Sequence, residues 1–173
     1  MVFRKYAFRP YSKDFPNWFR REKAGLKKVL PSDAIIAHVG STAVPGLGGK
    51  GIIDILVSVK KPRLKEARRL LESQGFVFKR KAGSTQRLFF QKDQVLFGKL
   101  QRFHVHLTFH DSLTFRRTLA LAEFLKARPK FRIEYAALKK KAVKLAKEDG
   151  KKYRAVKKEF LENLTNEALT GFG

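Results

Sequence analysis

The residue types best suited to chemistry gather in the first third of the chain. A glycine-serine pair, Gly40-Ser41, follows a short apolar run, and Thr42 comes directly after it. Glycines let backbone N–H groups approach phosphate oxygens closely, and a serine hydroxyl adds another donor. Asp54 lies in the next apolar run, where positions 52, 54, 56 and 58 share the less apolar face of a strand. We therefore expect Gly40, Ser41 and Thr42 to contact a phosphate beside the Asp54 carboxylate.

Two histidines alternate along a later apolar run at 102–109. His104 and His106 share one face of this predicted strand, and the opposite face is apolar throughout. If this strand lies beside that of Asp54, two imidazoles and a carboxylate converge. Such a set suits a transition metal such as manganese, iron or zinc, or else a general base or a protonated phosphate ligand. The alternative is two polar histidines on a solvated sheet face.

Basic residues provide further candidates for phosphate contacts. Lys50 shortly precedes the Asp54 strand, and Arg87 begins another short strand. Lys139 flanks the apolar stripe of a helix at 134–147, so its side chain is expected to reach inward. For Lys50 and Arg87, the alternative to a phosphate contact is a side chain in water. The stripe itself is predicted to comprise Leu138, Ala142 and Leu145. The other lysines of this region are expected to face water, with contact to a nucleic-acid backbone as the alternative: Lys140, Lys144, Lys147 and Lys151.

Composition favours one strongly basic, soluble domain. The 173 residues include 39 Lys and Arg against 15 Asp and Glu, and the net charge of +24 is spread along the whole chain. A polyanion such as RNA or DNA is therefore an expected partner, and a merely solvated basic surface is the alternative. The absence of cysteine excludes disulfides, thiolate metal sites and cysteine nucleophiles. Residues 1–10 hold no long apolar run, so we expect no signal peptide, no membrane partner and a cytoplasmic location. Nothing indicates the oligomeric state.

Apolar periodicity and turn formers predict the element order. Helices are expected at about 14–30 and 62–74, and strands at 34–39, 52–59, 76–78, 87–91 and 102–109. From Ser112 onward the pattern is helical, with a break at Pro129, an end at Gly150 and a last helix at about 152–169. We expect a single domain over residues 1–173 of the α/β (α+β) class. Its small mixed sheet is flanked by helices, and about 112–173 forms a C-terminal helical array.

The sequence resembles the GrpB family, part of the DNA polymerase β-type nucleotidyltransferase superfamily. The likeness lies in the run 38–47 (HVGSTAVPGL), in the following lysine and in Ile52-Ile53-Asp54-Ile55. It continues at 87–90, 104–107, 115–116 and 135–139, and it ends with Tyr153, Lys157 and Phe160. The resemblance covers nearly the whole chain and implies a sheet of nucleotidyltransferase type. It also makes Arg116, Tyr153 and Lys157 candidate phosphate- or nucleotide-binding residues.

The resemblance leaves two hypotheses about activity. Nucleotidyltransferases align a nucleoside triphosphate with two metal ions, which are held by carboxylates one residue apart and by a third acid on a neighbouring strand. Asp54 matches the first acid, but Leu56 stands at the second position and 102–109 contains no acid. The first hypothesis is a nucleotidyltransferase-like protein that binds a nucleotide or a phosphorylated small molecule, with transfer of a nucleotidyl group as the activity to expect. Its catalytic and metal-binding residues would be Asp54, His104 and His106, with magnesium or manganese ahead of zinc. The second is an inactive fold that binds RNA or a ribonucleoprotein.

Overall fold

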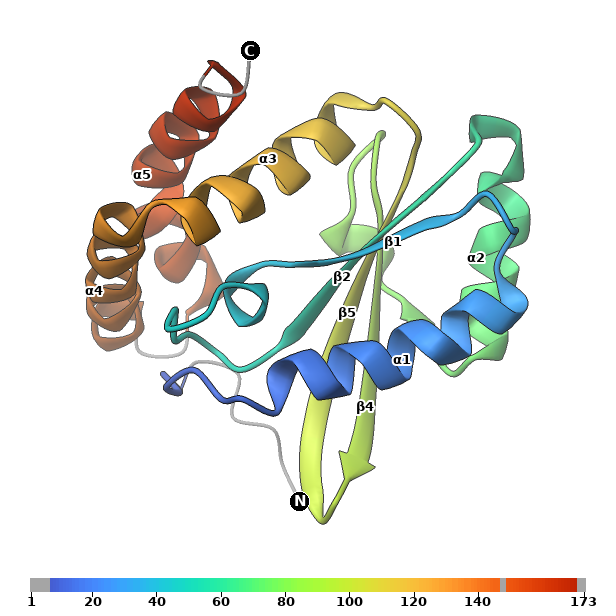
Figure 1. Cartoon of the computed structure of the whole chain (residues 1–173), viewed down its shortest axis with the longest axis horizontal. Helices are drawn as coiled ribbons and strands as arrows, with labels where there is room; N and C mark the ends of the chain where they lie inside the picture. Colours follow the sequence, from blue (N-terminus) through green and yellow to red (C-terminus); the bar gives the residue numbers. More distant parts are fainter. Residues whose placement is uncertain (1–6, 147–148, 171–173) are drawn as a thin grey trace.

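The computed structural model describes residues 7–146 and 149–170 (Figure 1). In this part of the chain one mixed sheet has the strand order β1-β2-β5-β4-β3. The strands are β1 (Ile35–Val39), β2 (Ile53–Val59), β3 (Val77–Phe78), β4 (Leu88–Leu96) and β5 (Lys99–Phe109). The helices are α1 (Phe15–Val29), α2 (Leu64–Ser73), α3 (Leu113–Ala127), α4 (Pro129–Ala146) and α5 (Gly150–Thr170). The predicted α+β fold, a mixed sheet flanked by helices with a helical C-terminal part, is confirmed.

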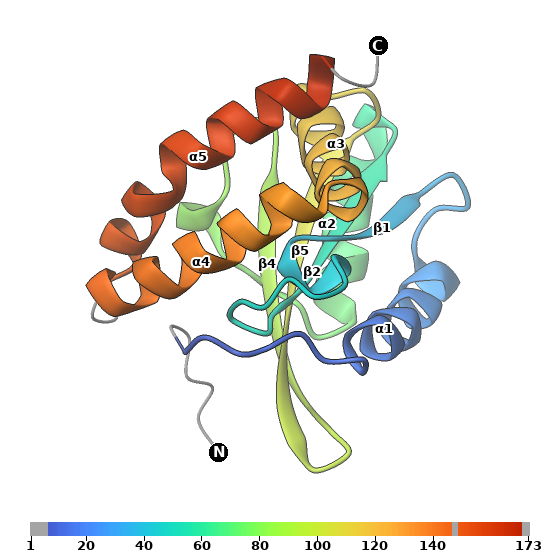
Figure 2. The same cartoon turned by 60° about the vertical axis from the view of Figure 1, so that its left-hand side comes forward.

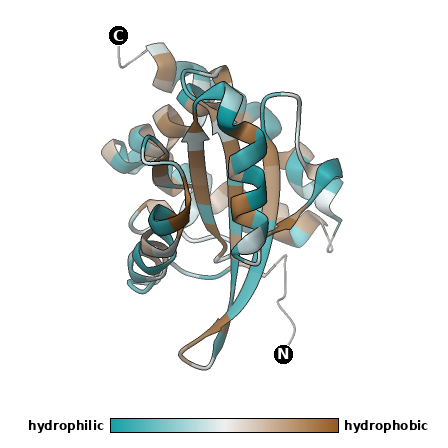
Figure 3. Cartoon of the chain, turned by 90° about the vertical axis from the view of Figure 1, so that its right-hand side faces the viewer, coloured by the Kyte–Doolittle hydropathy of each residue, from teal (hydrophilic) through white to brown (hydrophobic). Residues whose placement is uncertain are grey.

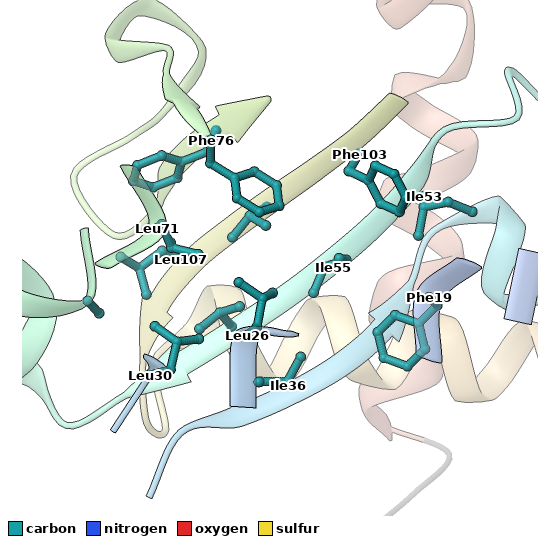
Figure 4. Packing of buried hydrophobic residues seen from close by; sticks show 14 of the residues in the cluster. Phe19, Leu26, Leu30, Ile36, Ile53, Ile55, Leu71, Phe76, Phe103 and Leu107 are labelled. Carbon is teal, nitrogen blue, oxygen red and sulfur yellow. The ribbon is translucent and has the colours of Figure 1, made fainter. Parts of the chain in front are cut away.

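The largest core lies between the sheet and helices α1 and α2. The odd-numbered residues of β2, from Ile53 to Val59, all point into this core and are fully buried. They pack against Leu26 of α1, Leu71 of α2 and Phe103 of β5 (Figure 4). Burying each such side chain stabilises the fold by about 1.5–3 kcal/mol. The alternation of β2 therefore fixes which face carries Asp54, namely the one opposite this core.

The three C-terminal helices form a second layer on the Asp54 side of the sheet. Helix α3 packs through Ala122 against Val39 and Leu56. The helices also share a core of their own, to which the 40–51 loop contributes Val44 and Leu47. Figure 2 shows α3, α4 and α5 grouped together, away from α1. The loop after β1 is thus held between the sheet and the helical layer.

The buried face of α4 differs from the prediction. Leu145, expected in the apolar stripe, is 53% exposed, whereas the buried positions are Tyr135, Lys139, Ala142 and Ala146. Lys139 thus lies in the middle of the buried face instead of at its margin. The shift arises because α4 packs against the glycine-rich loop as well as α5, and that loop offers a carbonyl to the lysine. Among the lysines expected to face water, Lys140, Lys144 and Lys151 are exposed, while Lys147 lies outside the described residues.

The hairpin of β4 and β5 is longer than the sequence suggested. Its strands pair from Leu88↔Leu107 out to Leu96↔Lys99 and turn at Phe97-Gly98, where both residues have positive φ, 49° and 74°. Phe97 is 81% exposed. Figure 3 shows the hairpin extending beyond the helices with an apolar tip. The extension was missed because polar and apolar residues do not alternate regularly in 92–101, and of its apolar side chains only that of Leu96 is buried.

No helix within the described ranges has both the length and the apolar character needed to cross a bilayer.

Candidate functional site

The centre of the site is formed by the parallel pairing of β2 with β5. Asp54 is the register partner of His104, and Leu56 that of His106. Asp54 Oδ1 lies 3.3 Å from His104 Nδ1 and 3.2 Å from His106 Nε2. The expected convergence is therefore observed. The alternative of a solvated histidine face is wrong, because helices cover this face and the two side chains are only 10% and 16% exposed.

A third group, Arg87, fixes the protonation pattern of His106. Arg87 Nη1 lies 3.0 Å from His106 Nδ1, and Nη2 donates to the Ala82 carbonyl at 2.9 Å. A guanidinium has no acceptor, so Nδ1 must accept and the ring proton sits on Nε2. His106 then donates that proton to Asp54. Hydrogen bonds therefore run from the Arg87 guanidinium to the His106 imidazole and from that imidazole to the Asp54 carboxylate.

Asp54 is ionised in this setting. Burial alone would raise the pKa of its carboxyl, but the hydrogen bonds from His104 and His106 and their electrostatic attraction outweigh burial and hold the pKa well below its usual range. The carboxylate also explains Gly40, which has φ 70°. A Cβ at Gly40 would lie 2.6 Å from Asp54 Oδ2. Only glycine allows the loop to approach the carboxylate so closely.

The two residues after Gly40 have different roles. Ser41 begins a 3₁₀ turn and lines the cavities described below. Thr42 is buried, and its hydroxyl donates to the Ile52 carbonyl at 3.0 Å and lies 3.0 Å from His38 Nε2. This hydroxyl thus ties the loop to β2, and Thr42 lines neither of the cavities described below, so its phosphate contact stays a prediction.

Lys139 is the most deeply buried cation of the site. Its side chain comes from α4, its ammonium donates to the Gly48 carbonyl, and Nζ lies 4.6 Å from the centre of the Tyr135 ring. Burial lowers the pKa of Lys139 to about 7, with the charge of Lys157 acting in the same direction and that of Asp54 opposing. Burial also raises the pKa of Tyr135, so its phenol stays protonated.

Two further lysines flank the ring of Tyr153. Lys157 Nζ lies 4.3 Å and Lys50 Nζ 5.0 Å from the ring centre. Burial, together with the smaller effect of the neighbouring charge of Lys50, lowers the pKa of Lys157 to about 8, while the charge of Asp54 opposes the shift. Each amine sits over an aromatic face, an arrangement that stabilises a cation in a partly desolvated site.

These residues border two adjoining cavities. One has a volume of about 550 Å³ and includes Arg87 and His106, and the other, of about 180 Å³, includes Lys50, His104, Lys139 and Tyr153. Both are lined by Gly40, Ser41, Asp54, Tyr135 and Lys157. Every candidate residue except Thr42 and Arg116 lines one or both cavities. Their common wall is Asp54 on the sheet side and α4 and α5 on the other.

One arginine among the candidates lies outside both cavities, and one tyrosine that lines both was not among the candidates. Arg116 is exposed on α3 and lines neither cavity, whereas its neighbour Arg117 lines the larger one. A shift of one residue rotates a helical side chain by roughly 100°, since a turn has about 3.6 residues. Tyr135 lies in the 135–139 stretch of the family resemblance, but an aromatic residue on a helix face is usually core. Its position in both cavities could be assigned only from the structure.

The donor set does not fit the metal sites expected from the resemblance. Leu56 is fully buried, and Asp54 is the single carboxylate among the residues lining the two cavities. Within residues 7–146 and 149–170, no group of three His, Cys, Asp or Glu side chains is arranged to hold a metal ion. Asp54 Oδ1 already accepts from two imidazoles, and Arg87 occupies the remaining nitrogen of His106. A magnesium, manganese or zinc ion would also meet the charges of Arg87 and Lys157.

Comparison with known proteins identifies the relatives of this chain. The family model described as GrpB protein matches residues 6–167. UPF0157 protein YqkA of Bacillus subtilis is 32% identical over 139 residues, which cover 79% of this chain but only 39% of YqkA. The crystal structure of the conserved protein GrpB from Enterococcus faecalis has a TM-score of 0.82 at 27% identity, and the match covers 96% of this chain and 99% of that one. The likeness to a crystal structure of the Cid1 poly(U) polymerase is much weaker, with a TM-score of 0.47 at 17% identity over 71% of this chain and 41% of that one. The chain belongs to the GrpB family.

Proposed function

We propose that this chain binds a nucleotide or a related phosphorylated small molecule in the two joined cavities. The observation that carries the proposal is the charge of their walls. Cationic groups from four separate segments, Lys50, Arg87, Lys139 and Lys157, surround the single carboxylate of Asp54. Removing cations from water is costly unless an anion accompanies them. In the described chain no salt bridge joins Lys139 or Lys157 to a carboxylate, so a phosphate group would supply the missing countercharge.

Asp54 adds a second requirement to the ligand. An ionised carboxylate repels phosphate but accepts hydrogen bonds from hydroxyl or amino groups. The ligand therefore needs an anionic part for the lysines and a donor-bearing part for Asp54. A nucleotide has both, in its phosphates and in its ribose or base. The larger cavity, about 550 Å³, is within the range of small-molecule sites.

Nucleotidyl transfer is the reaction to test in this site, on account of the family resemblance. In such a transfer an acceptor oxygen attacks the α-phosphorus and pyrophosphate leaves. Lys157 and Arg87 would stabilise the charge on the phosphate oxygens, because fixed cations in a water-poor site act strongly on developing charge. Ser41 would donate to one of those oxygens. Asp54 and His106 would orient the nucleoside.

Titration calorimetry with ATP, GTP, CTP and UTP, each with and without magnesium, tests the binding. Lys157→Met removes one cation from the cavities, and Lys158→Met, on the next residue of α5 with a 73% exposed side chain, is the matched control. A hydrogen bond to a charged group contributes about 1.5–3 kcal/mol, so Lys157→Met should weaken binding by roughly 10- to 150-fold. Lys158→Met should bind like the parent. Failure of every nucleotide to bind, or equal affinities in the two variants, would refute the proposal.

The transfer step has its own test. Release of pyrophosphate from the tightest-binding nucleotide should require Asp54, so Asp54→Asn should abolish turnover while circular dichroism shows a folded protein. Unchanged turnover in this variant would exclude Asp54 from the reaction.

A further inference from the structure

A second basic surface lies beside the site, at the β3 edge of the sheet. Residues 73–92 contain no Asp or Glu, and five of them are Lys or Arg. Three of the five, Lys79, Arg80 and Lys81, lie at a 3₁₀ turn between β3 and β4 and are exposed. They form no salt bridge with any described residue, whereas Lys92 pairs with Glu22. The turn therefore carries three exposed positive charges without a salt-bridge partner, although Asp93, which is paired with Arg102, lies within electrostatic reach of Lys79.

Two aromatic side chains border these cations. Phe89 lies on the sheet face that carries Asp54, whereas the Phe78 ring packs on Phe90 of the main core and has the Arg68 guanidinium 4.2 Å from its centre. An open cavity of about 530 Å³ is lined by the three basic residues together with Phe78, Phe89, Ala82 and Gln91. A neighbouring cavity of about 600 Å³ continues past Phe78 and Arg80 to Ser84 and Thr85. A cationic groove with aromatic faces is the usual arrangement for single-stranded nucleic acid, since phosphates meet the cations and unpaired bases stack on the rings.

The register of the sheet connects this surface to the site. Across the strands, Asp54 pairs with His104 and His104 with Gln91, while His106 pairs with Phe89. Paired residues of neighbouring strands point to the same face, so Phe89 and Gln91 continue the face that carries Asp54. The Phe89 ring centre lies 4.7 Å from that of His104 and 5.3 Å from that of His106. The cavity at the turn is thus adjacent to the site, because Phe89 lines the cavity and its ring contacts both histidines.

We propose that this surface, made of Phe78, Lys79, Arg80, Lys81 and Phe89, binds a single-stranded polynucleotide whose end reaches the site as the acceptor. The role as acceptor rests on the proposed function, but the binding itself does not. In the transfer, the terminal hydroxyl oxygen of the strand bonds to the α-phosphorus of the bound nucleoside triphosphate. The bond from that phosphorus to the bridging oxygen breaks, pyrophosphate leaves and the hydroxyl proton passes to water.

The pairing of cations with rings favours a strand with unpaired bases over other polyanions. A duplex keeps its bases stacked inside, so Phe89 would have no base to stack on. An acidic peptide would meet the lysines and equally leave this ring unused. Both are competitors in the test below.

Fluorescence anisotropy with labelled ten-nucleotide strands, one RNA and one DNA, tests the surface. Arg80→Gln/Lys81→Gln removes two charges at the turn, and Lys27→Gln/Lys28→Gln removes two exposed charges from α1, which packs on the opposite face of the sheet. We expect the first pair to lose at least tenfold in affinity and the second pair to bind like the parent. The salt dependence should also fall, by roughly 0.7 in slope for each lost phosphate contact. Equal losses in both pairs, or equal competition by duplex RNA or polyglutamate, would overturn the proposal.

Nucleotide titration of the same variants separates this inference from the proposed function. Arg80 and Lys81 lie outside the nucleotide cavities, so Arg80→Gln/Lys81→Gln should keep the parent's nucleotide affinity. If nucleotides bind and neither strand does, the surface proposal fails and the site proposal stands. If a strand binds at the turn and no nucleotide binds, the site proposal fails and the chain acts as a polynucleotide-binding module.

Discussion

Replacing Lys139 by methionine should stabilise the protein, even though Lys139 lies in the candidate site. The side chain is only 2% exposed, and burial lowers the pKa of its ammonium from 10.5 to about 7. Because lowering a pKa by one corresponds to about 1.4 kcal/mol, holding the charged amine in the folded state costs on the order of 5 kcal/mol. Methionine has a similar length and no charge. It would leave the Gly48 carbonyl without its donor, a loss of about 1–3 kcal/mol.

The stability gained by Lys139→Met should decrease as the pH rises. At pH 6 the lysine is protonated in both the folded and the unfolded states, and its burial cost is present in full. Above about pH 7 the folded protein releases the proton while the unfolded chain keeps it up to about pH 10.5, so the parent becomes more stable as the pH rises. The advantage of Lys139→Met, about 2–4 kcal/mol at pH 6, should therefore shrink by roughly 2–3 kcal/mol by pH 9.

Urea unfolding at pH 6, 7, 8 and 9 measures this difference. The fluorescence of Trp18, the chain's single tryptophan and a core residue, reports the transition. Lys140→Met is the control, because it removes the same charge from an exposed position of α4. A free-energy difference between Lys139→Met and the parent that stays constant from pH 6 to 9 would refute the burial argument. A parallel loss of nucleotide binding would show that this cost is borne for function.

Three further outcomes follow from the site. Nucleotide affinity measured by calorimetry should fall between pH 6.5 and 9, because Lys139 and Lys157, with pKa values of about 7 and 8, lose their positive charges; an affinity that rises with pH would contradict the role of these lysines. Gly40→Ala should cost about 1–3 kcal/mol in thermal unfolding, since φ is 70° and the new Cβ meets Asp54 Oδ2 at 2.6 Å. The control Gly25→Ala in α1, where a Cβ meets nothing within 4 Å, should be neutral or stabilising. Nitrogen NMR should find the His106 proton on Nε2, and Arg87→Met should weaken that preference. A proton found on Nδ1 in the parent would exclude the assigned hydrogen bonds from Arg87 to His106 and from His106 to Asp54.

The sequence predicts the site best where the alternation of a single strand determines the face on which a side chain lies. Alternation alone places Asp54 on the face opposite the main core, and it places His104 and His106 on a common face. Their meeting depends on which strands are neighbours and in what register, and no local pattern carries that information. It was therefore expected only on the condition that the two strands lie side by side, and the β2–β5 pairing meets that condition.

The sequence does not identify the contacts of side chains whose partners are distant along the chain. Thr42 looks like one more hydroxyl in a phosphate loop, but its acceptor at Ile52 is identified only when the loop closes. The inward position of Lys139 in α4 depends on a carbonyl 91 residues earlier. Arg116 is a different case, because the resemblance gives residue matches and does not say which face of α3 meets the sheet.

The parallel pairing of β2 with β5 also has a consequence for the order in which the protein is made. β2 leaves the ribosome with β1 on one side, and its other edge stays open until residues 99–109 have been synthesised. The intervening chain must cross over before that pairing can form, and pairings between distant segments form slowly. During that interval the nascent chain carries an apolar strand with an unpaired edge, the kind of surface on which chains associate wrongly. The strand that bears both histidines therefore also protects the growing protein from aggregation.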